Sequence, residues 1–397
     1  MENRFVGKEE MEGNMENISV IVPIYHGIKY IDNMIVRLEK CMEKSSSRCT
    51  IELLLVNDDP AEQIGSFSSE KINVKVIETD RNRGIHGARV RGLNLCTGDY
   101  VLFLDQDDII YPDYFNSQLE HLKDKDAVVC KLLHEGRQYY DNRTPFEKVI
   151  NREFMIGSRN PIISPGQVLL KKNRIPKMWT DIALKSNGAD DWLLWLCMFS
   201  EGSEFALNPD LLFEHVVEGQ NESVNVQHME NSENELYEIV AANGILTGQE
   251  LETLRVTIKN VTAGRVATLV KFRKMFFVYD AWLRLLEQDI SISDYLLGRG
   301  IKSIAVYGDN QIGKRLYHAL KKEGICVRYF IDMNAEYLKE EIPVYMPEAP
   351  LQKVDMVIIS LVESIDSIRT TLSGLLDTRI YGITELIEEI EKSTRIY

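Results

Sequence analysis

Carboxylates gather at two points of the chain, each directly after a short apolar run. Leu53–Val56 is followed by Asn57, Asp58 and Asp59, and Val101–Leu104 is followed by the acidic stretch D-Q-D-D at 105–108. Carboxylate oxygens are ligands for hard divalent cations and strong acceptors for N–H donors. If the fold brings both clusters together, they can hold a metal ion and an anionic ligand.

The elements around these acids follow an α/β pattern. Short apolar runs at 18–24, 51–56, 72–77 and 100–104 predict buried strands, and the three- and four-residue spacing of apolar side chains over 31–42 predicts an amphipathic helix. In an open α/β sheet, ligands bind at the carboxyl ends of the strands, so both clusters are expected at one edge. Loop acids after strands are commonly only solvated, and neither cluster alone decides the function.

The length of 397 residues predicts more than one domain. The stretch 231–290 lacks proline and has helical periodicity, and a second α/β pattern begins with the apolar run 301–307. We therefore expect the following parts: a flexible leader at 1–17, a first α/β domain at 18–230, a helical connector at 231–297 and a Rossmann-like α/β domain at 298–397.

Composition limits the partners and the compartment. The formal net charge of -15 disfavours a nucleic-acid partner, because phosphates would be repelled. The six cysteines have no C-x-x-C spacing, and no apolar run approaches the roughly 20 residues that span a bilayer. The acidic first 17 residues do not have the pattern of a secretory signal. These features predict a cytoplasmic protein.

Four motifs occur in a fixed order within the first α/β region. They are V-P-I-Y-H-G-I-K-Y-I at 22–31, L-L-V-N-D-D-P at 54–60, N-R-G-I-H-G-A-R at 82–89 and L-D-Q-D-D-I-I-Y-P at 104–112. This order resembles the family two glycosyltransferases over about residues 18–220, most densely up to Tyr114. The resemblance implies a GT-A type nucleotide-diphospho-sugar transferase domain, which moves a sugar from a nucleoside diphosphate to a hydroxyl.

The resemblance also implies a nucleotide-sugar site. Pro23 and Tyr25 match the segment that holds the base, and Asp58 matches the aspartate whose carboxylate accepts the ring N–H of uracil. Thymine and guanine offer a similar donor, so the base stays open, although a UDP-sugar is the expected donor. Arg89 matches an arginine beside the diphosphate, and a surface salt bridge is its competing explanation.

Asp105-Gln106-Asp107 matches the D-x-D motif of the family. The resemblance implies that all three residues belong to the nucleotide-sugar site and that the two carboxylates hold Mg²⁺ or Mn²⁺ against the diphosphate oxygens, with Asp107 as the direct ligand. The ion would neutralise the leaving nucleoside diphosphate. His215 stands where many relatives carry a histidine and is a candidate third ligand, although a lone histidine is more often structural.

The segment 187–195, N-G-A-D-D-W-L-L-W, resembles the family's G-x-E-D-x-x-L-W, with Asp190 in place of the usual Glu. On this match Asp191 is the general base, and Asp190 is the other candidate catalytic residue. At the start of a helix, and with an unperturbed pKa of about 3.9, Asp191 is expected to be ionised at neutral pH. One base suffices for single displacement with inversion, and no second motif offers a carboxylate nucleophile.

The second α/β region begins with a loop, Gly308 to Gly313, which is followed some twenty residues later by Asp332, as in a dinucleotide-binding unit. Its middle glycine is replaced by Asn310, which disfavours tight NAD binding. A structural or oligomerising module, a small-ligand sensor and a cofactor-using domain remain open. We favour the first, with homo-oligomer formation through this domain.

The expected function is an inverting, metal-dependent hexosyltransferase of bacterial surface polysaccharide synthesis, with a glycan or lipid-linked acceptor. A lipid-linked acceptor would bring peripheral contact with the inner face of the membrane. Three alternatives remain: a catalytically silent nucleotide-sugar-binding scaffold, a nucleotidyltransferase and an NAD-dependent sugar dehydrogenase. A nucleotidyltransferase usually begins with a Gly-rich basic loop, which V-P-I-Y-H-G lacks.

Overall fold

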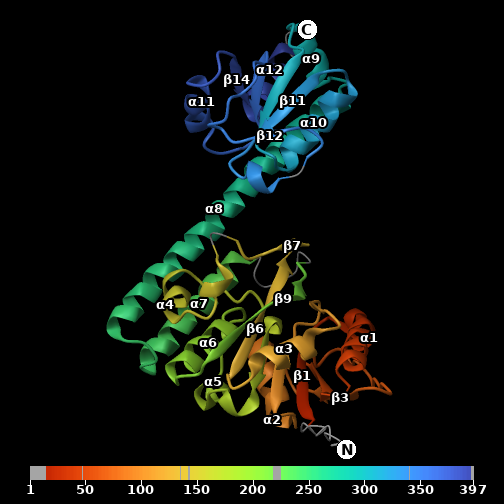
Figure 1. The fold of residues 1–397 in the computed structure, drawn as a ribbon, viewed down its shortest axis with the longest axis vertical. Coiled ribbons are helices and arrows are strands. Elements are labelled where there is room, and N and C mark those ends of the chain that lie inside the picture. The colour runs from red at the N-terminus through yellow and green to blue at the C-terminus, as the bar shows by residue number, and fades with distance from the viewer. Residues whose placement is uncertain are drawn as a thin grey trace, which may run out of the picture. The chain divides into compact units, whose positions relative to one another are not determined.

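The computed structural model describes residues 15–46, 48–134, 136–141, 144–217, 225–338 and 340–394. Residues 1–14 of the expected leader therefore lie outside the described part. The chain divides into two compact units, residues 1–264 and 265–397, each with its own sheet (Figure 1). Within the described residues, no helix is both long enough and apolar enough to cross a bilayer.

The first unit is built on a mixed sheet with the strand order β3-β2-β1-β4-β8-β6-β9-β5, and β7 pairs with β6. Its strands are β1 (Glu16–Ile24), β2 (Cys49–Asn57), β3 (Asn73–Glu78), β4 (Tyr100–Phe103), β5 (Ile109–Ile110), β6 (Ala127–His134), β7 (Arg137–Gln138), β8 (Val168–Lys171) and β9 (Phe205–His215). β1 begins at Glu16, two residues before the expected strand, and it includes the last two residues of the expected leader.

The strands β1 to β4 are parallel, so their carboxyl ends lie at one edge. Side chains alternate along β1: Ile21 joins the core on one face, and Val20 and Val22 join the core on the other. Both faces are buried, which explains why these strands are continuous apolar runs. The α/β expectation and the common edge for both acidic clusters are confirmed.

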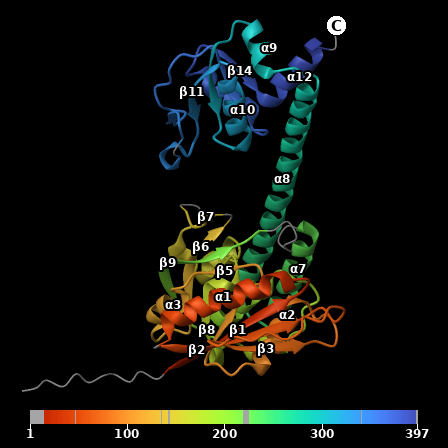
Figure 2. The same ribbon diagram turned by 90° about the vertical axis from the view of Figure 1, so that its right-hand side faces the viewer.

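Helices cover both faces of this sheet (Figure 2). They are α1 (Ile28–Ser45), α2 (Gly84–Leu95), α3 (Tyr114–Leu122), α4 (Arg152–Gly157), α5 (Lys177–Asp181), α6 (Asp190–Ser200) and α7 (Val226–Ala242). α2 approaches the sheet closely, because a Cβ atom at Gly92 would lie 2.4 Å from a methyl carbon of Ile21. This contact fixes the helix that carries Arg89 against β1.

The stretch predicted as a helical connector contains most of α7, then α8 (Gly248–Glu287) and α9 (Ile292–Gly298). Leu254 and Ile258 near the start of α8 pack in the core of the first unit, and Val278 and Trp282 near its end pack in the core of the second. These helices are therefore divided between the two units.

The second unit has a five-stranded parallel sheet with the order β12-β11-β10-β13-β14, as in doubly wound folds. Its elements are β10 (Ser303–Tyr307), α10 (Gln311–Lys322), β11 (Cys326–Ile331), β12 (Val344–Tyr345), β13 (Met356–Ile359), α11 (Ile365–Ser373), β14 (Arg379–Gly382) and α12 (Ile383–Thr394). The predicted second α/β domain is therefore present as a sheet with helices.

The loop after β10 is filled by its own side chains. Asn310 caps α10, because its Oδ1 accepts a hydrogen bond from the N–H of Gly313 at 2.9 Å. Asp332 accepts the N–H of Asp309 at 2.9 Å. Gly308 has φ +101°, and a Cβ atom at Gly313 would lie 2.3 Å from the Gly308 carbonyl oxygen. These glycines allow a tight turn and close helix packing.

Candidate functional site

Asp58 follows β2 and is held at the carboxyl edge of the sheet. Its N–H donates to the Ile24 carbonyl at 2.8 Å, and its Oδ1 accepts the N–H of Arg83 at 2.8 Å. The side chain is buried, and burial raises its pKa although the N–H groups of Arg83 and Gly84 lower it. The carboxylate is therefore fixed between the end of β1 and the start of α2.

Gln106 joins the acidic turn after β4 to the loop after β1. Its Oε1 accepts the N–H of Tyr25, and its Nε2 donates to the Tyr25 carbonyl, both at 3.0 Å. A Cβ atom at Gly27 would lie 1.9 Å from Gln106 Oε1, so only glycine leaves room for this amide. Pro23, at the end of β1, is buried, whereas the Tyr25 ring is exposed. The predicted residues Pro23, Tyr25 and Gln106 thus come from adjoining segments.

Arg89 connects the acidic turn to the start of α6. Its Nη2 lies 2.5 Å from Asp105 Oδ1, and its Nη1 lies 2.6 Å from Asp190 Oδ2. Arg89 is only 2% exposed, so its ion pairs are buried rather than on the surface, and its place beside the diphosphate stays a prediction. Both pairs are charge-assisted, and they bring segments from 16 and 101 residues away onto one cation. Arg89 therefore has the geometry of a residue that holds Asp105 and Asp190 in position.

Asp191 lies beside this pair in the first turn of α6. Its Oδ2 accepts a hydrogen bond from Asn160 Nδ2 at 3.0 Å, and its Oδ1 accepts the Trp192 N–H at 2.6 Å. Burial raises the pKa of Asp191, and the neighbouring Asp190 raises it further, against the opposing effect of Arg89. The expectation of an ordinary, low pKa was wrong, because desolvation outweighs the helix terminus and the cation.

His215 meets the acidic turn through the short strand β5. Ile109 of β5 pairs with Glu214 of β9, which places His215 Nδ1 2.8 Å from Asp108 Oδ1. Burial, Asp108 and Asp105 raise the pKa of Asp107 to about 6, and His215 lowers it. The three aspartates and the histidine therefore share one electrostatic environment.

The donor types around Asp107 suit a divalent cation, but among the described residues Asp105, Asp107 and His215 do not form a set whose ligand atoms all lie within 4.8 Å of one another. Asp105 and Asp107 supply carboxylate oxygens. Burial, and then repulsion from Asp108 and Asp105, raises the pKa of Asp107, and a cation would relieve the repulsion. A metal-binding histidine usually has its other ring nitrogen bonded to a carboxylate, as Asp108 bonds Nδ1 here, which leaves Nε2 of His215 as the ligand atom.

A second acidic group lies near Asp58. In the described part of the chain, His26, Asp59 and Glu62 form a set of three residues whose ligand atoms lie within 4.8 Å of one another. His26 Nδ1 is 3.1 Å from Asp59 Oδ2, and the histidine is largely exposed. Exposed acidic groups of this kind are common without an ion, and we assign no metal to it.

Sequence reasoning gave no role to Asp108 and missed Asn160 and Ser164. Asp108 is buried and accepts hydrogen bonds from Ser164 Oγ at 2.8 Å and from the Val216 N–H at 3.1 Å. Asp108 was visible as the last acid of the D-Q-D-D run. Asn160 and Ser164 lie in a loop without a recognisable motif, and only the folded structure places them beside the acids.

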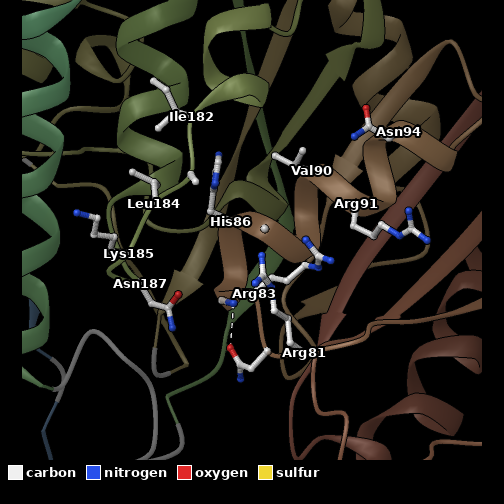
Figure 3. Close-up of a pocket in the computed structure, with 14 residues that line it drawn as sticks. Arg81, Arg83, His86, Val90, Arg91, Asn94, Ile182, Leu184, Lys185 and Asn187 are labelled. Carbon is white, nitrogen blue, oxygen red and sulfur yellow. Dashed lines mark hydrogen bonds between the residues drawn. The ribbon is translucent and has the colours of Figure 1, made fainter.

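A cavity of about 650 Å³ lies along α2 (Figure 3). Arg83 and Gly84 line it and also neighbour Asp58, but Asp105, Asp107 and Asp191 are not among its lining residues. Its other polar lining is mainly basic or amide, contributed by Arg81, Asn82, His86, Arg91, Asn94, Lys185 and Asn187. This cavity is therefore distinct from the acidic cluster.

Residues 19–175 match the family model described as Glycosyl transferase family 2. This region contains Asp58, Arg89 and the acidic turn at 105–108. This part of the first unit is therefore similar to glycosyltransferase family 2.

Similar proteins match parts of the chain. An uncharacterized glycosyltransferase of Haemophilus influenzae is 32% identical over 120 residues, which cover 29% of this chain and 46% of that protein. The amylovoran biosynthesis glycosyltransferase AmsB of Erwinia amylovora is 34% identical over 161 residues, which cover 38% of this chain and 44% of that protein. The chain thus spans less than half of each of these relatives. S. aureus TarS 1-349, solved in complex with UDP-GlcNAc, has a TM-score of 0.44 and 20% identity, covering 57% of this chain and 71% of that one.

Proposed function

We propose that the first unit transfers a sugar from a nucleoside diphosphate donor, a UDP-sugar, to a hydroxyl of a glycan or lipid-linked acceptor. One observation carries the proposal: a single buried guanidinium, that of Arg89, is bonded to Asp105 of the D-x-D turn and to Asp190 beside Asp191. This shared contact supports a single site that contains the proposed metal-binding acids and the proposed base. The match of residues 19–175 to the model of glycosyltransferase family 2 supports the same chemistry.

The donor nucleoside is assigned to Pro23, Tyr25 and Asp58, which lie at or just after the carboxyl ends of β1 and β2. Asp58 accepts one N–H from Arg83, and a carboxylate has capacity for several more hydrogen bonds. One of them would take the ring N–H of uracil. The exposed ring of Tyr25 offers an aromatic surface for the base.

The diphosphate is assigned to Mn²⁺ or Mg²⁺ held by Asp105, Asp107 and His215. A bound cation would neutralise the charge that develops on the leaving diphosphate. The chain's own part is to orient these ligands: Arg89 fixes Asp105, and Asp108 fixes the ring of His215. Asp107 remains the proposed direct ligand.

The proton of the acceptor hydroxyl is assigned to Asp191. In one displacement, the acceptor oxygen attacks the anomeric carbon, the bond to the diphosphate oxygen breaks and the proton moves to the Asp191 carboxylate, which inverts the anomeric configuration. A raised pKa suits this role, because a general base works best when its pKa is near the working pH. Asn160 would hold one carboxylate oxygen and direct the other.

The proposed setting is bacterial surface polysaccharide synthesis, since AmsB, one of the similar proteins, is an amylovoran biosynthesis glycosyltransferase. We place the protein in the cytoplasm, in peripheral contact with the inner face of the membrane when the acceptor is lipid-linked. Homo-oligomer formation through the second unit remains part of the proposal.

The decisive experiment compares the wild type with Asp191→Asn on a panel of nucleotide sugars and Mn²⁺, measuring the release of nucleoside diphosphate. We expect the substitution to lower the rate about a hundredfold or more and to change the donor Kd by less than about twofold. Asp181→Asn, an exposed acid of α5, is the matched control. Normal turnover in Asp191→Asn would refute the assignment of the base. Donor binding without turnover by the wild type would identify a silent nucleotide-sugar-binding protein instead.

A further inference from the structure

Part of α8 has an unusual charge for this protein. Between residues 253 and 279 the chain has no Asp or Glu but has six basic residues, although the whole chain carries 61 acidic residues against 46 basic ones. The six are Arg255, Lys259, Arg265, Lys271, Arg273 and Lys274. The segment is therefore locally cationic within an anionic chain.

The same segment exposes large apolar side chains. Phe272, Phe276 and Phe277 are 60%, 64% and 53% exposed, and Val266, Leu269 and Val270 are 45–49% exposed. The positions 266, 269, 270, 276 and 277 repeat at helical spacing, so these side chains share one face, and Phe272 lies at its border. At the same helical spacing Arg273 falls within this face, Lys274 borders it and Lys271 lies on the other side of the helix. We call the six apolar residues, with Lys271, Arg273 and Lys274, the α8 patch. All of them belong to the second unit.

Few contacts within the chain neutralise this patch. Lys274 lies 3.3 Å from Glu363, and both side chains are exposed. Neither Lys271 nor Arg273 has an acidic partner within 4.0 Å among the residues that the structure describes. The Arg273 guanidinium lies over the Phe277 ring, 5.7 Å from its centroid. Cations and aromatic rings are thus displayed together.

We propose that the α8 patch binds the surface of an anionic phospholipid bilayer. Amphipathic helices that combine Lys and Arg with Phe and Leu lie in the plane of the bilayer interface, with the apolar side chains among the acyl chains and the basic groups near the headgroups. The length of the apolar face, about three helical turns from Val266 to Phe277, suits this interfacial binding.

Charge favours a lipid surface over a second copy of the chain. Two α8 patches packed face to face would bring Arg273 and the flanking lysines of both copies together, and like charges at such an interface are destabilising. An anionic surface is attracted by the same groups. The proposal does not depend on the proposed transferase activity, since its test measures binding to lipid without a sugar donor.

The test is flotation of the full chain with vesicles of equal parts phosphatidylglycerol and phosphatidylcholine, compared with phosphatidylcholine alone. We expect binding to the anionic vesicles, at least about tenfold weaker binding to neutral ones, and loss of binding as salt rises. Equal binding to both vesicles, or to neither, overturns the proposal.

Two paired substitutions test the patch itself. Phe276→Ser with Phe277→Ser, and Lys271→Glu with Arg273→Glu, should each weaken anionic-vesicle binding about tenfold or more. The controls Leu375→Ser and Lys353→Glu change exposed residues elsewhere in the second unit and should bind as the wild type does. Circular dichroism melting verifies that the variants fold, which is expected because the changed side chains are exposed.

Other occupants of the patch would give different results. Sedimentation velocity that shows a dimer sensitive to the paired substitutions, without vesicle binding, would assign the patch to a second copy. Binding of a fluorescent single-stranded oligonucleotide with the same sensitivity, again without vesicle binding, would assign it to nucleic acid. Either result would overturn the lipid proposal.

Discussion

At the scale of single residues, burial decides what the acids near Arg89 can do. Asp190, Asp191 and Arg89 are all buried, so their charges interact through a medium that screens them weakly. Removing one member of such a group leaves a buried charge without a partner of opposite sign. The free energy of unfolding then falls by more than the intact pair contributed. The guanidinium matters for its shape as well as its charge, because it reaches two carboxylates at once.

Arg89→Lys should therefore behave as a disruptive substitution. A lysine offers a single ammonium group, which cannot reproduce the two-sided contact with Asp105 and Asp190. We expect the free energy of unfolding to fall by about 2 to 4 kcal/mol and turnover to fall about tenfold or more. Urea unfolding and the nucleotide-release assay measure these effects.

Arg91→Lys is the matched control, since Arg91 belongs to the same helix, is exposed and lines the cavity instead. If Arg89→Lys and Arg91→Lys unfold at the same urea concentration, the buried bridge does not stabilise the site in the way we describe.

At the scale of elements, the buried Glu52 joins strands and a turn. Its Oε1 accepts hydrogen bonds from Ser19 Oγ at 2.5 Å, Thr97 N–H at 2.5 Å and Gly98 N–H at 3.2 Å, and its Oε2 lies 2.9 Å from Lys75 Nζ. These partners come from β1, β3 and the turn before β4. Burial would raise the pKa of Glu52, but the bonds from Ser19, Lys75 and Thr97 lower it to about 2.

Glu52→Gln should change how stability depends on pH. The pKa in the folded chain lies below the ordinary value of 4.5, so the stabilisation is present above about pH 4.5 and is lost as the pH falls toward 2. We expect the substitution to lower the free energy of unfolding by about 1 to 3 kcal/mol at pH 7 and to flatten its decline in acid.

Thermal unfolding of wild type and Glu52→Gln from pH 7 to pH 3 measures this effect. Glu43→Gln changes an exposed acid paired with Lys71 and should leave the curve nearly unchanged. Parallel curves for wild type and Glu52→Gln would contradict the assignment.

The elements were largely predictable from the sequence, because strands buried on both faces give continuous apolar runs and helices give a three- to four-residue period. Because the strands before Asp58 and before the acidic turn could be recognised as parallel strands of one sheet, both could be placed at its carboxyl edge. Asn160 and the His215–Asp108 bond could not, since they depend on loops and on the pairing of β5 with β9. The raised pKa of Asp191 depends on burial, which a local motif does not reveal.

At the scale of the whole molecule, two units with separate sheets share the helix α8. The sequence predicted helices in this region but treated them as a body of their own, because periodicity shows which face is apolar and not which core that face joins. The structure assigns Leu254 to one core and Trp282 to the other. The role of the second unit remains the structural or oligomerising module that we propose.

Gly308→Ala tests this role. Gly308 has φ +101°, and a Cβ atom there would lie 2.7 Å from Ser360 Oγ. We expect the free energy of unfolding of the second unit to fall by about 1 to 3 kcal/mol, with little change in nucleotide release. Gly298→Ala, where nothing lies within 4 Å of the added carbon, is the control. Calorimetry measures the stability of both variants.

A titration with NAD tests the alternative that this loop binds a cofactor. Tight binding of NAD by the wild type that is lost in Gly308→Ala would make the loop a cofactor site.

The hydrogen bond from Arg83 to Asp58 comes from the main-chain N–H. The contact with Asp58 is therefore separate from whatever the side chain of Arg83 does. The amide that holds the carboxylate would be supplied by any amino acid except proline at this position, while the arginine side chain faces the cavity along α2. Substitutions at position 83 can therefore reshape the wall of that cavity and leave Asp58 in place, so the shape of the cavity and the position of this carboxylate can change independently in evolution.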